Sequence, residues 1–446
     1  MSLRTTIQPV LTNLLTSTRT RALRRRFRET LRLMTGRPHR VLYFHQVDDP
    51  YSHLAAQLLE PLVERYDVEL VVHLVGPPPD DAAPERDRLV AYSRVDAARI
   101  ARARGLHFHD PRAQPAAHLV ESAARLLAAV PSPRAFAALA PRVGEALWDG
   151  DGETLRKLAR DQPESDPVDL AALLRRGNAA RHRAGHYLGA VFHYAGENYW
   201  GVDRLAYLEN RWLGLGLLRQ PAALHLAPPL DVTDERIDAA AAGMTLEFFV
   251  SLRSPYSYIA FERTLDLVAR SGVTLRLRPV LPMVMRGLSV PLAKRLYIIS
   301  DTKREADSVG IPFGRICDPV GAPVERGFSL YGFATSKGRG AEYLQSFCRA
   351  AFAEGVDTGS DDGLRKVVEA AGLSWVEAQA SVDPDGWRTE LETNRQEMMA
   401  LGLWGVPSYR LRGPEGVEDF CTWGQDRIWL VEEEIGRRCA VGGLAT

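Results

Sequence analysis

Cysteine is scarce in this chain of 446 residues, and no two cysteines lie close together in the sequence. The four thiols, Cys317, Cys348, Cys421 and Cys439, all lie in the second half, and no pair has the C-x-x-C spacing. The absence of such a pair excludes the redox-active dithiol that a C-x-x-C motif forms. Sparse, unpaired cysteines are typical of a reducing compartment, so the sequence predicts a cytoplasmic protein.

Two further absences limit the class of protein. No apolar run approaches the roughly 20 residues that cross a bilayer. Neither sign of charge is in excess, because 56 lysines and arginines balance 56 aspartates and glutamates. We therefore expect neither a membrane-spanning chain nor nucleic acid as the principal partner. The hydrophobic content of 46% is ordinary for a globular protein, and the length suits two domains of roughly 150–200 residues.

The first 40 residues depart from this balance. They hold ten arginines and a single acid, Glu29, and their apolar residues recur at near-helical spacing. Three interpretations stay open. The segment has the Arg-rich, acid-poor composition of an organelle transit peptide, it suits a basic amphipathic helix on an anionic lipid surface, and it suits a helical arm packed on the protein.

The chain also repeats itself. Residues Val41–Ala55 read like Leu246–Ala260, because in each a β-branched and aromatic run is followed by a polar residue, Pro-Tyr-Ser and an amphipathic helical pattern. Tyr199–Glu209 likewise matches Thr422–Glu432. Between these anchors most apolar residues have helical spacing. We therefore predict a duplication in which each half has the order strand, helix, strand, helical block, two strands and a last helix.

The same matches set the expected boundaries. Second strands are expected at Val68–Val75 and Val273–Val280. A proline-rich stretch with an alanine run after Asp238 reads as the linker between the halves. The expected segments are a basic helical arm at 1–40, a first domain at 41–220, the linker at 221–243 and a second domain at 244–446.

The first motif with chemical potential follows the first strand of the second half. In Ser254-Pro255-Tyr256-Ser257, serine is a favoured N-cap and proline a favoured first helical residue, so the plain interpretation is a helix start. The functional interpretation places the Ser254 hydroxyl at the positive end of the helix dipole. There it can donate to a thiolate whose pKa the dipole lowers.

Two more motifs lie near the end of the chain. The Gly-Val-Pro-Ser-Tyr segment at 405–409 reads as a turn that enters a strand. A cis bond before Pro407 would leave the N–H and C=O of Val406 free to pair with an extended peptide. In the Trp-Gly-Gln-Asp-Arg segment at 423–427, backbone N–H groups attract a carboxylate and Asp426 can pair with an ammonium group. A turn proline and an acid in a first helical turn are the plain alternatives.

Taken together and in this order, the motifs resemble the 2-hydroxychromene-2-carboxylate isomerase family and its relative, the kappa-class glutathione transferases. The resemblance extends over residues 245–438 and more faintly over the first half. It implies an α/β fold of two tandem thioredoxin-like domains of the DsbA type, each with a helical insertion. It also implies glutathione as the cofactor.

The resemblance further implies roles for individual residues. Ser254 would hold the glutathione sulfur as a thiolate, and Val406, before Pro407, would pair with the cysteinyl backbone. Gln425 and Asp426 would take the γ-glutamyl end. The implied reaction begins with reversible addition of the glutathione sulfur to an unsaturated, ring-opened substrate, which permits rotation before the thiol leaves.

The second half departs from the family's pattern in one segment. Where the family has an asparagine in Gly-Asn-x-Pro, this chain has Leu288-Ser289-Val290-Pro291, which leaves Ser289 as the candidate at that place. The histidines have no metal-ligand spacing, and no metal is expected.

The first half departs further. Asp49 stands where Ser254 stands in the second copy, and its charge would repel a thiolate. Counting back from the matched tryptophans sets Ala184 at the place of Pro407, and matching tyrosines instead gives Gly185, so neither alignment supplies a proline. We expect this copy to be catalytically silent, as a built-in dimer partner or a recognition module.

The leading hypothesis is a glutathione-dependent isomerase or transferase that acts on an aromatic or otherwise electrophilic small molecule. The alternative is a non-catalytic thioredoxin-fold protein that binds a peptide or a partner's strand, and a thiol–disulfide oxidase comes third. The oligomeric state stays open, since the two halves can mimic the family's dimer or pair again as a homodimer. Peripheral membrane contact through the basic arm stays open as well.

Overall fold

The computed structural model of the chain describes residues 3–161, 169–219, 225–233, 237 and 243–442. It divides into two compact units, one of residues 23–229 with 290–297, the other of residues 1–22, 230–289 and 298–446. Parts of the expected linker, including its alanine run, lie outside the described residues. The domain boundaries expected from the sequence stay predictions.

The N-terminal unit is built on a four-stranded sheet with the order β2-β1-β3-β4. Strand β1 (Arg40–Gln46) pairs in parallel with β2 (Glu69–Val75) and antiparallel with β3 (Val191–Tyr194). Strand β4 (Glu197–Trp200) closes the sheet as an antiparallel partner of β3. Burial is nearly continuous along β1 and includes the aromatic Tyr43 and Phe44, which agrees with the buried strand predicted from the sequence.

Helices pack around this sheet, and half of those that the structure describes lie between β2 and β3 in the chain. The helices of the unit are α2 (Thr18–Met34, from Leu23 on), α3 (Pro50–Ala56), α4 (Leu59–Arg65), α5 (Arg86–Arg104), α6 (Ala117–Ala128), α7 (Pro133–Trp148), α8 (Gly152–Arg160), α9 (Leu170–Arg183), the short η1 (Val202–Arg204) and α10 (Leu205–Leu213). The apolar core includes residues of the sheet, α3, α7 and α10, and its largest fully buried side chain is Trp212.

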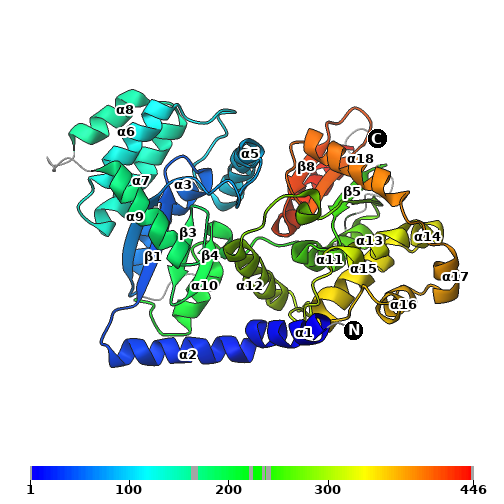
Figure 1. Cartoon of the computed structure of the whole chain (residues 1–446). Helices are drawn as coiled ribbons and strands as arrows, with labels where there is room; N and C mark the ends of the chain where they lie inside the picture. Colours follow the sequence, from blue (N-terminus) through cyan, green and yellow to red (C-terminus); the bar gives the residue numbers. More distant parts are fainter. Residues whose placement is uncertain (1–2, 162–168, 220–224, 234–236, 238–242, 443–446) are drawn as a thin grey trace. The chain divides into compact units, whose positions relative to one another are not determined.

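The C-terminal unit has a sheet of the same design, with the order β6-β5-β7-β8. Strand β5 (Thr245–Val250) pairs in parallel with β6 (Thr274–Pro279) and antiparallel with β7 (Ser408–Arg412). Strand β8 (Phe420–Trp423) is the antiparallel partner of β7. Helix α11 (Pro255–Ser271) connects β5 to β6 (Figure 1).

The helical block of this unit lies between β6 and β7 in the chain. The remaining helices that the structure describes are α1 (Leu3–Thr16), η3 (Met283–Arg286), α12 (Leu292–Ser308, in this unit from Ile298 on), α13 (Ala322–Ser329), α14 (Tyr331–Ser336), α15 (Gly340–Arg349), η4 (Ala350–Glu354), α16 (Asp361–Ala370), α17 (Trp375–Ala380), α18 (Trp387–Ala400), η5 (Gln425–Arg427) and α19 (Ile428–Gly442). In the core, Phe248 on β5 stacks on Tyr409 of β7, with ring centroids 5.1 Å apart, and meets Phe261 of α11 edge-on.

The predicted order of elements is confirmed in both halves. Beyond strand order and pairing direction, three contacts recur at equivalent positions. The first is a hydrogen bond from a tyrosine to an aspartate, Tyr51 Oη to Asp96 (2.7 Å) in the N-terminal half and Tyr256 Oη to Asp301 (2.9 Å) in the C-terminal half. The second is a hydrogen bond from a backbone N–H to a serine, Gln46 N to Ser52 Oγ (3.2 Å) and Ser251 N to Ser257 Oγ (3.4 Å). The third is an ion pair, Arg65 to Glu209 (3.7 Å) and Arg270 to Glu432 (2.9 Å).

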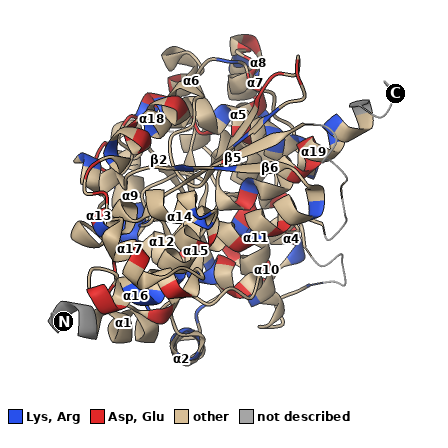
Figure 2. Ribbon diagram, turned by 90° about the vertical axis from the view of Figure 1, so that its right-hand side faces the viewer, with Lys and Arg blue, Asp and Glu red and all other residues tan. Residues whose placement is uncertain are grey.

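Charged residues are distributed over the fold as the balanced composition indicates. Basic and acidic residues are interspersed over the ribbon in Figure 2. Among the described helices, none combines the length and the apolar character needed to cross a bilayer.

Candidate functional site

The site begins at the turn that joins β5 to α11. Ser254 is the N-cap of α11, with an extended backbone (φ −96°, ψ 112°), and its Oγ accepts a hydrogen bond from the Ser257 N–H at 3.1 Å. Pro255 is the first helical residue, as predicted. This cap fixes the Ser254 hydroxyl at the positive end of a 17-residue helix.

The Ser254 hydroxyl faces the turn that enters β7. It donates to the carbonyl oxygen of Val406 over 3.4 Å, and the Val406–Pro407 peptide bond is cis. A hydrogen bond of this length is weak. Among the residues that the structure describes, none accepts a hydrogen bond from the Val406 N–H. Ser254 and Val406 are both half-buried, so a loosely held hydroxyl and an unused backbone donor lie together where a ligand can reach them.

The third motif meets the second through the backbone. The N–H of Gly424 donates to the carbonyl of Pro407 at 2.9 Å. A Cβ added to Gly405 would lie 3.0 Å from the indole of Trp423, so glycine permits this close packing. Trp423 also meets Trp404 edge-on, with ring centroids 5.5 Å apart. All three sequence motifs therefore converge on one place.

Gln425 and Asp426 follow in the short helix η5, and their side chains differ in exposure. Gln425 is buried, and its amide oxygen accepts from Arg263 at 2.9 Å while its amide nitrogen donates to Glu305 at 2.7 Å. Asp426 is half-buried, with Oδ2 3.4 Å from Arg427 Nη1. The Gln425 side chain thus holds the turn to α11 and α12, whereas the Asp426 carboxylate retains access to solvent.

Ser289, the remaining candidate, lies between η3 and α12 and is exposed. Within the described part of the chain, its side chain shares no hydrogen bond with Ser254 or Val406. The structure therefore brings together the candidates of the three motifs and leaves Ser289 outside their hydrogen-bond network.

Two contacts beside Ser254 were not expected. Arg253 forms a bidentate ion pair with Asp318, with distances of 2.6 and 2.8 Å. Tyr256, on the first turn of α11, donates its hydroxyl to the buried Asp301 of α12 at 2.9 Å. Asp318 belongs to a segment to which the sequence assigned no role. The two pairs anchor the residues on either side of Ser254 in the sequence.

The chain's own thiols form no disulfide in the part of the chain that the structure describes. Cys317 and Cys348 are buried. Burial raises the pKa of the Cys348 thiol well above its ordinary value, so this thiol is inert at neutral pH.

In the N-terminal half, Asp49 caps α3 as Ser254 caps α11. Its carboxylate accepts from the Tyr51 N–H (3.3 Å), the Ser52 N–H (3.0 Å) and the Ser52 hydroxyl (2.7 Å). Burial raises the pKa of Asp49 from 3.8 to about 6. The group is therefore mostly ionised at neutral pH.

The register of the sheets corrects the expected counterpart of Pro407. Phe44 lies opposite Val191 as its equivalent Phe249 lies opposite Ser408, so Ala190 occupies the place of Pro407. The expectation of Ala184 or Gly185 is wrong because the β3–β4 turn (195–196) is shorter than the β7–β8 turn (413–419). The absence of a proline nevertheless holds.

Gly189, next to Ala190, approaches the Asp49 turn closely. A Cβ added at Gly189 would lie 2.9 Å from Asp49 Oδ2, 2.8 Å from Ser52 Oγ and 2.7 Å from Gln46 Cβ. The space beside this capping residue is therefore already filled.

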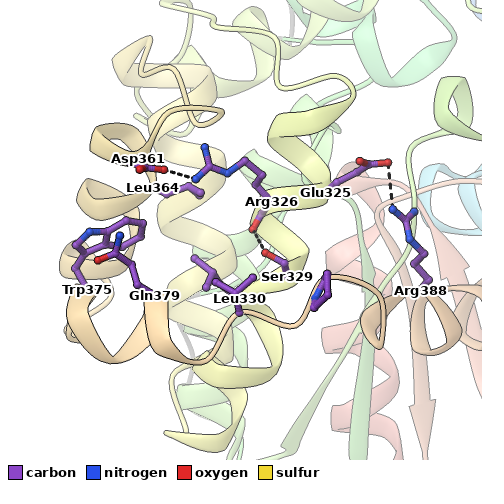
Figure 3. A pocket seen from close by; sticks show the side chains of 11 residues that line it. Glu325, Arg326, Ser329, Leu330, Asp361, Leu364, Trp375, Gln379 and Arg388 are labelled. Atoms are coloured by element: carbon purple, nitrogen blue, oxygen red, sulfur yellow. Dashed lines mark hydrogen bonds and ion pairs between the residues drawn. The ribbon is translucent and has the colours of Figure 1, made fainter.

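A separate pocket of about 380 Å³ lies in the helical block of the C-terminal unit. Figure 3 shows ion pairs that join Arg326 to Asp361 and Glu325 to Arg388 across it. Its lining residues are Glu325, Arg326, Ser329, Leu330, Asp361, Leu364, Trp375, Gln379, Val382, Pro384 and Arg388. None of them belongs to the three motifs, so this pocket is distinct from the Ser254 site.

Comparisons with known proteins assign the class of the C-terminal half. Residues 245–436 match the family model of the DSBA-like thioredoxin domain. This range contains every candidate residue from Ser254 to Asp426. The C-terminal half is therefore a DSBA-like thioredoxin domain.

Particular relatives match a similar share of the chain. The 2-hydroxychromene-2-carboxylate isomerase of Sphingobium xenophagum is 24% identical over 203 residues, covering 43% of this chain and 97% of the relative. The enzyme of the same name from Pseudomonas putida is 24% identical over 207 residues, covering 44% and 96%.

Solved structures match a similar share of the chain. One is a 2-hydroxychromene-2-carboxylate isomerase, at 20% identity and a TM-score of 0.38, covering 45% of this chain and 99% of that one. Another is the cytosolic disulfide reductase DsbM from Pseudomonas aeruginosa, at 23% identity and a TM-score of 0.35, covering 44% and 98%.

Proposed function

We propose that the C-terminal half binds glutathione and uses it in an isomerase or transferase reaction on an aromatic or otherwise electrophilic small molecule. One observation carries the proposal. The Ser254 hydroxyl lies 3.4 Å from the Val406 carbonyl, beside a Val406 N–H that no described residue accepts. The two relatives named 2-hydroxychromene-2-carboxylate isomerase support the reaction class.

The Ser254 hydroxyl suits a thiolate because its proton can be redirected at little cost. Its oxygen is held by the bond from the Ser257 N–H, whereas its proton is engaged only in the long contact with Val406. Rotation about the Cβ–Oγ bond turns the donor toward a ligand without moving the oxygen. The helix dipole of α11 favours the same negative charge.

The remaining polar groups suit the other parts of the tripeptide. The Val406 N–H and C=O would pair with the cysteinyl backbone, as in strand addition. The half-buried Asp426 carboxylate would accept from the γ-glutamyl ammonium group, while the buried Gln425 would hold the turn in place through Arg263 and Glu305. Ser289 would offer a hydroxyl where the family has an amide.

Glutathione, when bound, would supply a sulfur nucleophile whose reversible addition to a conjugated double bond permits rotation about that bond. The protein's role is to keep the glutathione sulfur ionised and to orient it toward the substrate. Ser254 and the N-terminus of α11 lower the pKa of the thiol, and the paired Arg253 and Asp318 hold the turn that carries Ser254.

We also propose that the N-terminal half is a second, diverged thioredoxin-like copy without this chemistry. The equal strand order and the three recurring contacts support a common origin. Asp49 would repel a thiolate, and Gly189 closes the space beside it. This half would serve as a built-in partner or recognition module.

A second candidate is a non-catalytic protein that binds an extended peptide at Val406. The Gln425 amide favours this candidate, because it hydrogen-bonds to Arg263 and Glu305 within the fold and those bonds compete with a bond to glutathione. Turnover of electrophilic aromatic compounds with glutathione would support the enzyme. Stoichiometric capture of a partner peptide, without such turnover, would support the binding protein.

Calorimetry with glutathione tests the leading proposal. The Ser254→Ala variant loses a hydrogen bond to a charged ligand, which predicts a Kd about tenfold or more higher. Ser360→Ala is the matched control, because Ser360 caps α16 through the Gly363 N–H at 3.1 Å but lies outside the three motifs. The proposal would be abandoned if glutathione failed to bind at millimolar concentration, or if both variants matched the wild type.

A further inference from the structure

The first helices of the chain contact the protein through their polar sides. In α2, Arg25 forms a bidentate ion pair with Glu197 of β4, at 2.7 and 2.6 Å. Glu29 and Arg32 are paired on the same side of the helix, at 2.7 Å. The charged side of α2 is therefore the side that contacts the N-terminal unit, and no described residue of α2 is buried.

The opposite side of α2 is apolar and exposed. Leu23, Phe27, Leu31 and Met34 recur at helical spacing and are 64, 70, 51 and 80% exposed. We call these four residues the outer stripe. A surface helix ordinarily buries its apolar side and exposes its charges. Helix α2 does the reverse, so its apolar side is available to a partner.

Helix α1 has the same character within the C-terminal unit. The hydroxyl of Thr12 accepts from the Ile316 N–H at 2.9 Å, and the Thr16 hydroxyl is buried beside Gly314. The exposed side of α1 carries Ile7 and Leu11, each about half exposed. Helix α1 also buries Pro9 beside Gly355, but both helices make polar contacts with their units and leave their leucines outward.

The charges around the outer stripe select the partner. At 3.6 residues per turn, Arg24 and Arg26 lie at the two edges of the stripe, and both are exposed. Residues 1–40 hold ten arginines and one acid, and that acid, Glu29, is paired with Arg32. A second copy of the chain would bring arginines against arginines. An apolar surface that is also anionic matches both features, and the interface of an anionic lipid bilayer has both.

We propose that the outer stripe rests on an anionic membrane surface. Phe27 and its neighbours enter the boundary between headgroups and acyl chains, and the arginines at the edges contact lipid phosphates. The ion pair between Arg25 and Glu197 holds the helix against the N-terminal unit while its apolar side is bound. The protein is then peripheral to the membrane and does not cross it.

Flotation of the full chain with lipid vesicles tests the proposal. We expect binding to vesicles of phosphatidylcholine mixed with phosphatidylglycerol, weaker binding in high salt, and little binding to phosphatidylcholine alone. The double variant Phe27→Ser/Leu31→Ser should bind at least about tenfold more weakly. Arg24→Gln/Arg26→Gln should lose about fivefold per arginine. Val376→Ser on α17, at a site 76% exposed, is the matched control and should bind as the wild type does.

Three results would overturn the proposal. The first is that the protein does not float with the anionic vesicles, and the second is that it binds both kinds of vesicle equally. The third is that the Phe27→Ser/Leu31→Ser variant binds as tightly as the wild type. Sedimentation velocity adds an independent measurement, because it needs no lipid. A wild-type dimer that becomes monomeric in this variant, together with no flotation, would assign the stripe to a second copy of the chain instead.

Discussion

Replacing Ser254 by aspartate would separate the chemistry of the proposed site from its fold. Aspartate is as good an N-cap as serine, and this chain already contains the arrangement in its other half. There the Asp49 carboxylate accepts from the Tyr51 N–H, the Ser52 N–H and the Ser52 hydroxyl. We therefore expect Ser254→Asp to keep α11 and to change the free energy of unfolding by no more than about 1 kcal/mol.

The effect on a bound thiolate would be much larger, because the sulfur loses a donor and meets a like charge. A hydrogen bond to a charged group contributes about 1.5–3 kcal/mol. Two unit charges about 4 Å apart repel by about 4 kcal/mol at an effective dielectric constant of about 20. The sum, about 6 kcal/mol, corresponds to a rise of about 4 units in the pKa of the bound thiol. Glutathione would then bind as the thiol at neutral pH.

Ultraviolet absorbance of the thiolate, followed against pH, measures this shift. We expect a lowered thiol pKa for glutathione bound to the wild type, an intermediate value with Ser254→Ala, and a value above that of free glutathione with Ser254→Asp. Calorimetry with S-methylglutathione supplies the control ligand. This compound has no thiolate to repel, so its Kd should change little in Ser254→Asp.

The reasoning would be refuted by one pattern in particular. If Ser254→Asp keeps the thermal midpoint of the wild type and also keeps the thiol pKa of bound glutathione, then the residue does not face the sulfur. A loss of affinity that is equal for glutathione and S-methylglutathione would likewise assign Ser254 a role other than thiolate stabilisation.

Three further predictions concern stability. The folded Asp49 binds its proton between pH 3.8 and about 6, where the unfolded chain has lost it, so stability falls as pH rises through this window. Denaturation across pH should find Asp49→Asn about 1–2 kcal/mol more stable at neutral pH, with the slope in this window reduced. Burial lowers the pKa of Lys294 from 10.5 to about 8, so stability should rise from pH 8 to 10.5, and Lys294→Met should flatten that rise in the same assay. Gly177→Ala on α9 would bring a Cβ 1.9 Å from the Leu74 carbonyl oxygen and should cost about 2–3 kcal/mol by thermal denaturation. Its control Gly436→Ala meets nothing within 4 Å and should gain about 0.5–1 kcal/mol.

The elements of the fold were predictable because their signals are local. Strand β5 is a mainly apolar run that is buried from Leu246 on, and the Ser254-Pro255 pair marks where α11 begins. The predicted strand at Val273–Val280 differs from β6 by one residue at each end. Each of these signals lies within a few residues of the feature that it predicts.

The contacts around the site were harder to predict, because they join residues far apart in the chain. Nothing near Arg253 or Asp318 in the sequence indicates that they pair across 65 residues. The hydrogen bonds that join the Gln425 amide to Arg263 and Glu305 were equally hard to predict, because the three residues lie on three separate helices.

One hidden contact did leave a signal in the sequence. Tyr51 and Asp96 are 45 residues apart, and so are Tyr256 and Asp301. A tyrosine and an aspartate that keep the same spacing in both halves indicate a contact that this arrangement of elements requires. Reading the repeat for paired polar residues, beyond its apolar pattern, would have predicted both hydrogen bonds.

The difference between the two halves is a coupled change rather than a single substitution. Asp49 is accommodated because Gly189 leaves room for its carboxylate, with a Cβ there coming within 2.9 Å of Oδ2. The residue that follows, Ala190, has φ +54° and stands where Pro407 stands in the other half. Serine at position 49 alone would therefore not recreate the Ser254 site, because the facing turn has changed as well. The N-terminal half thus differs from the C-terminal half on both sides of the Ser254 site, which favours the proposed role that does not depend on a bound thiolate.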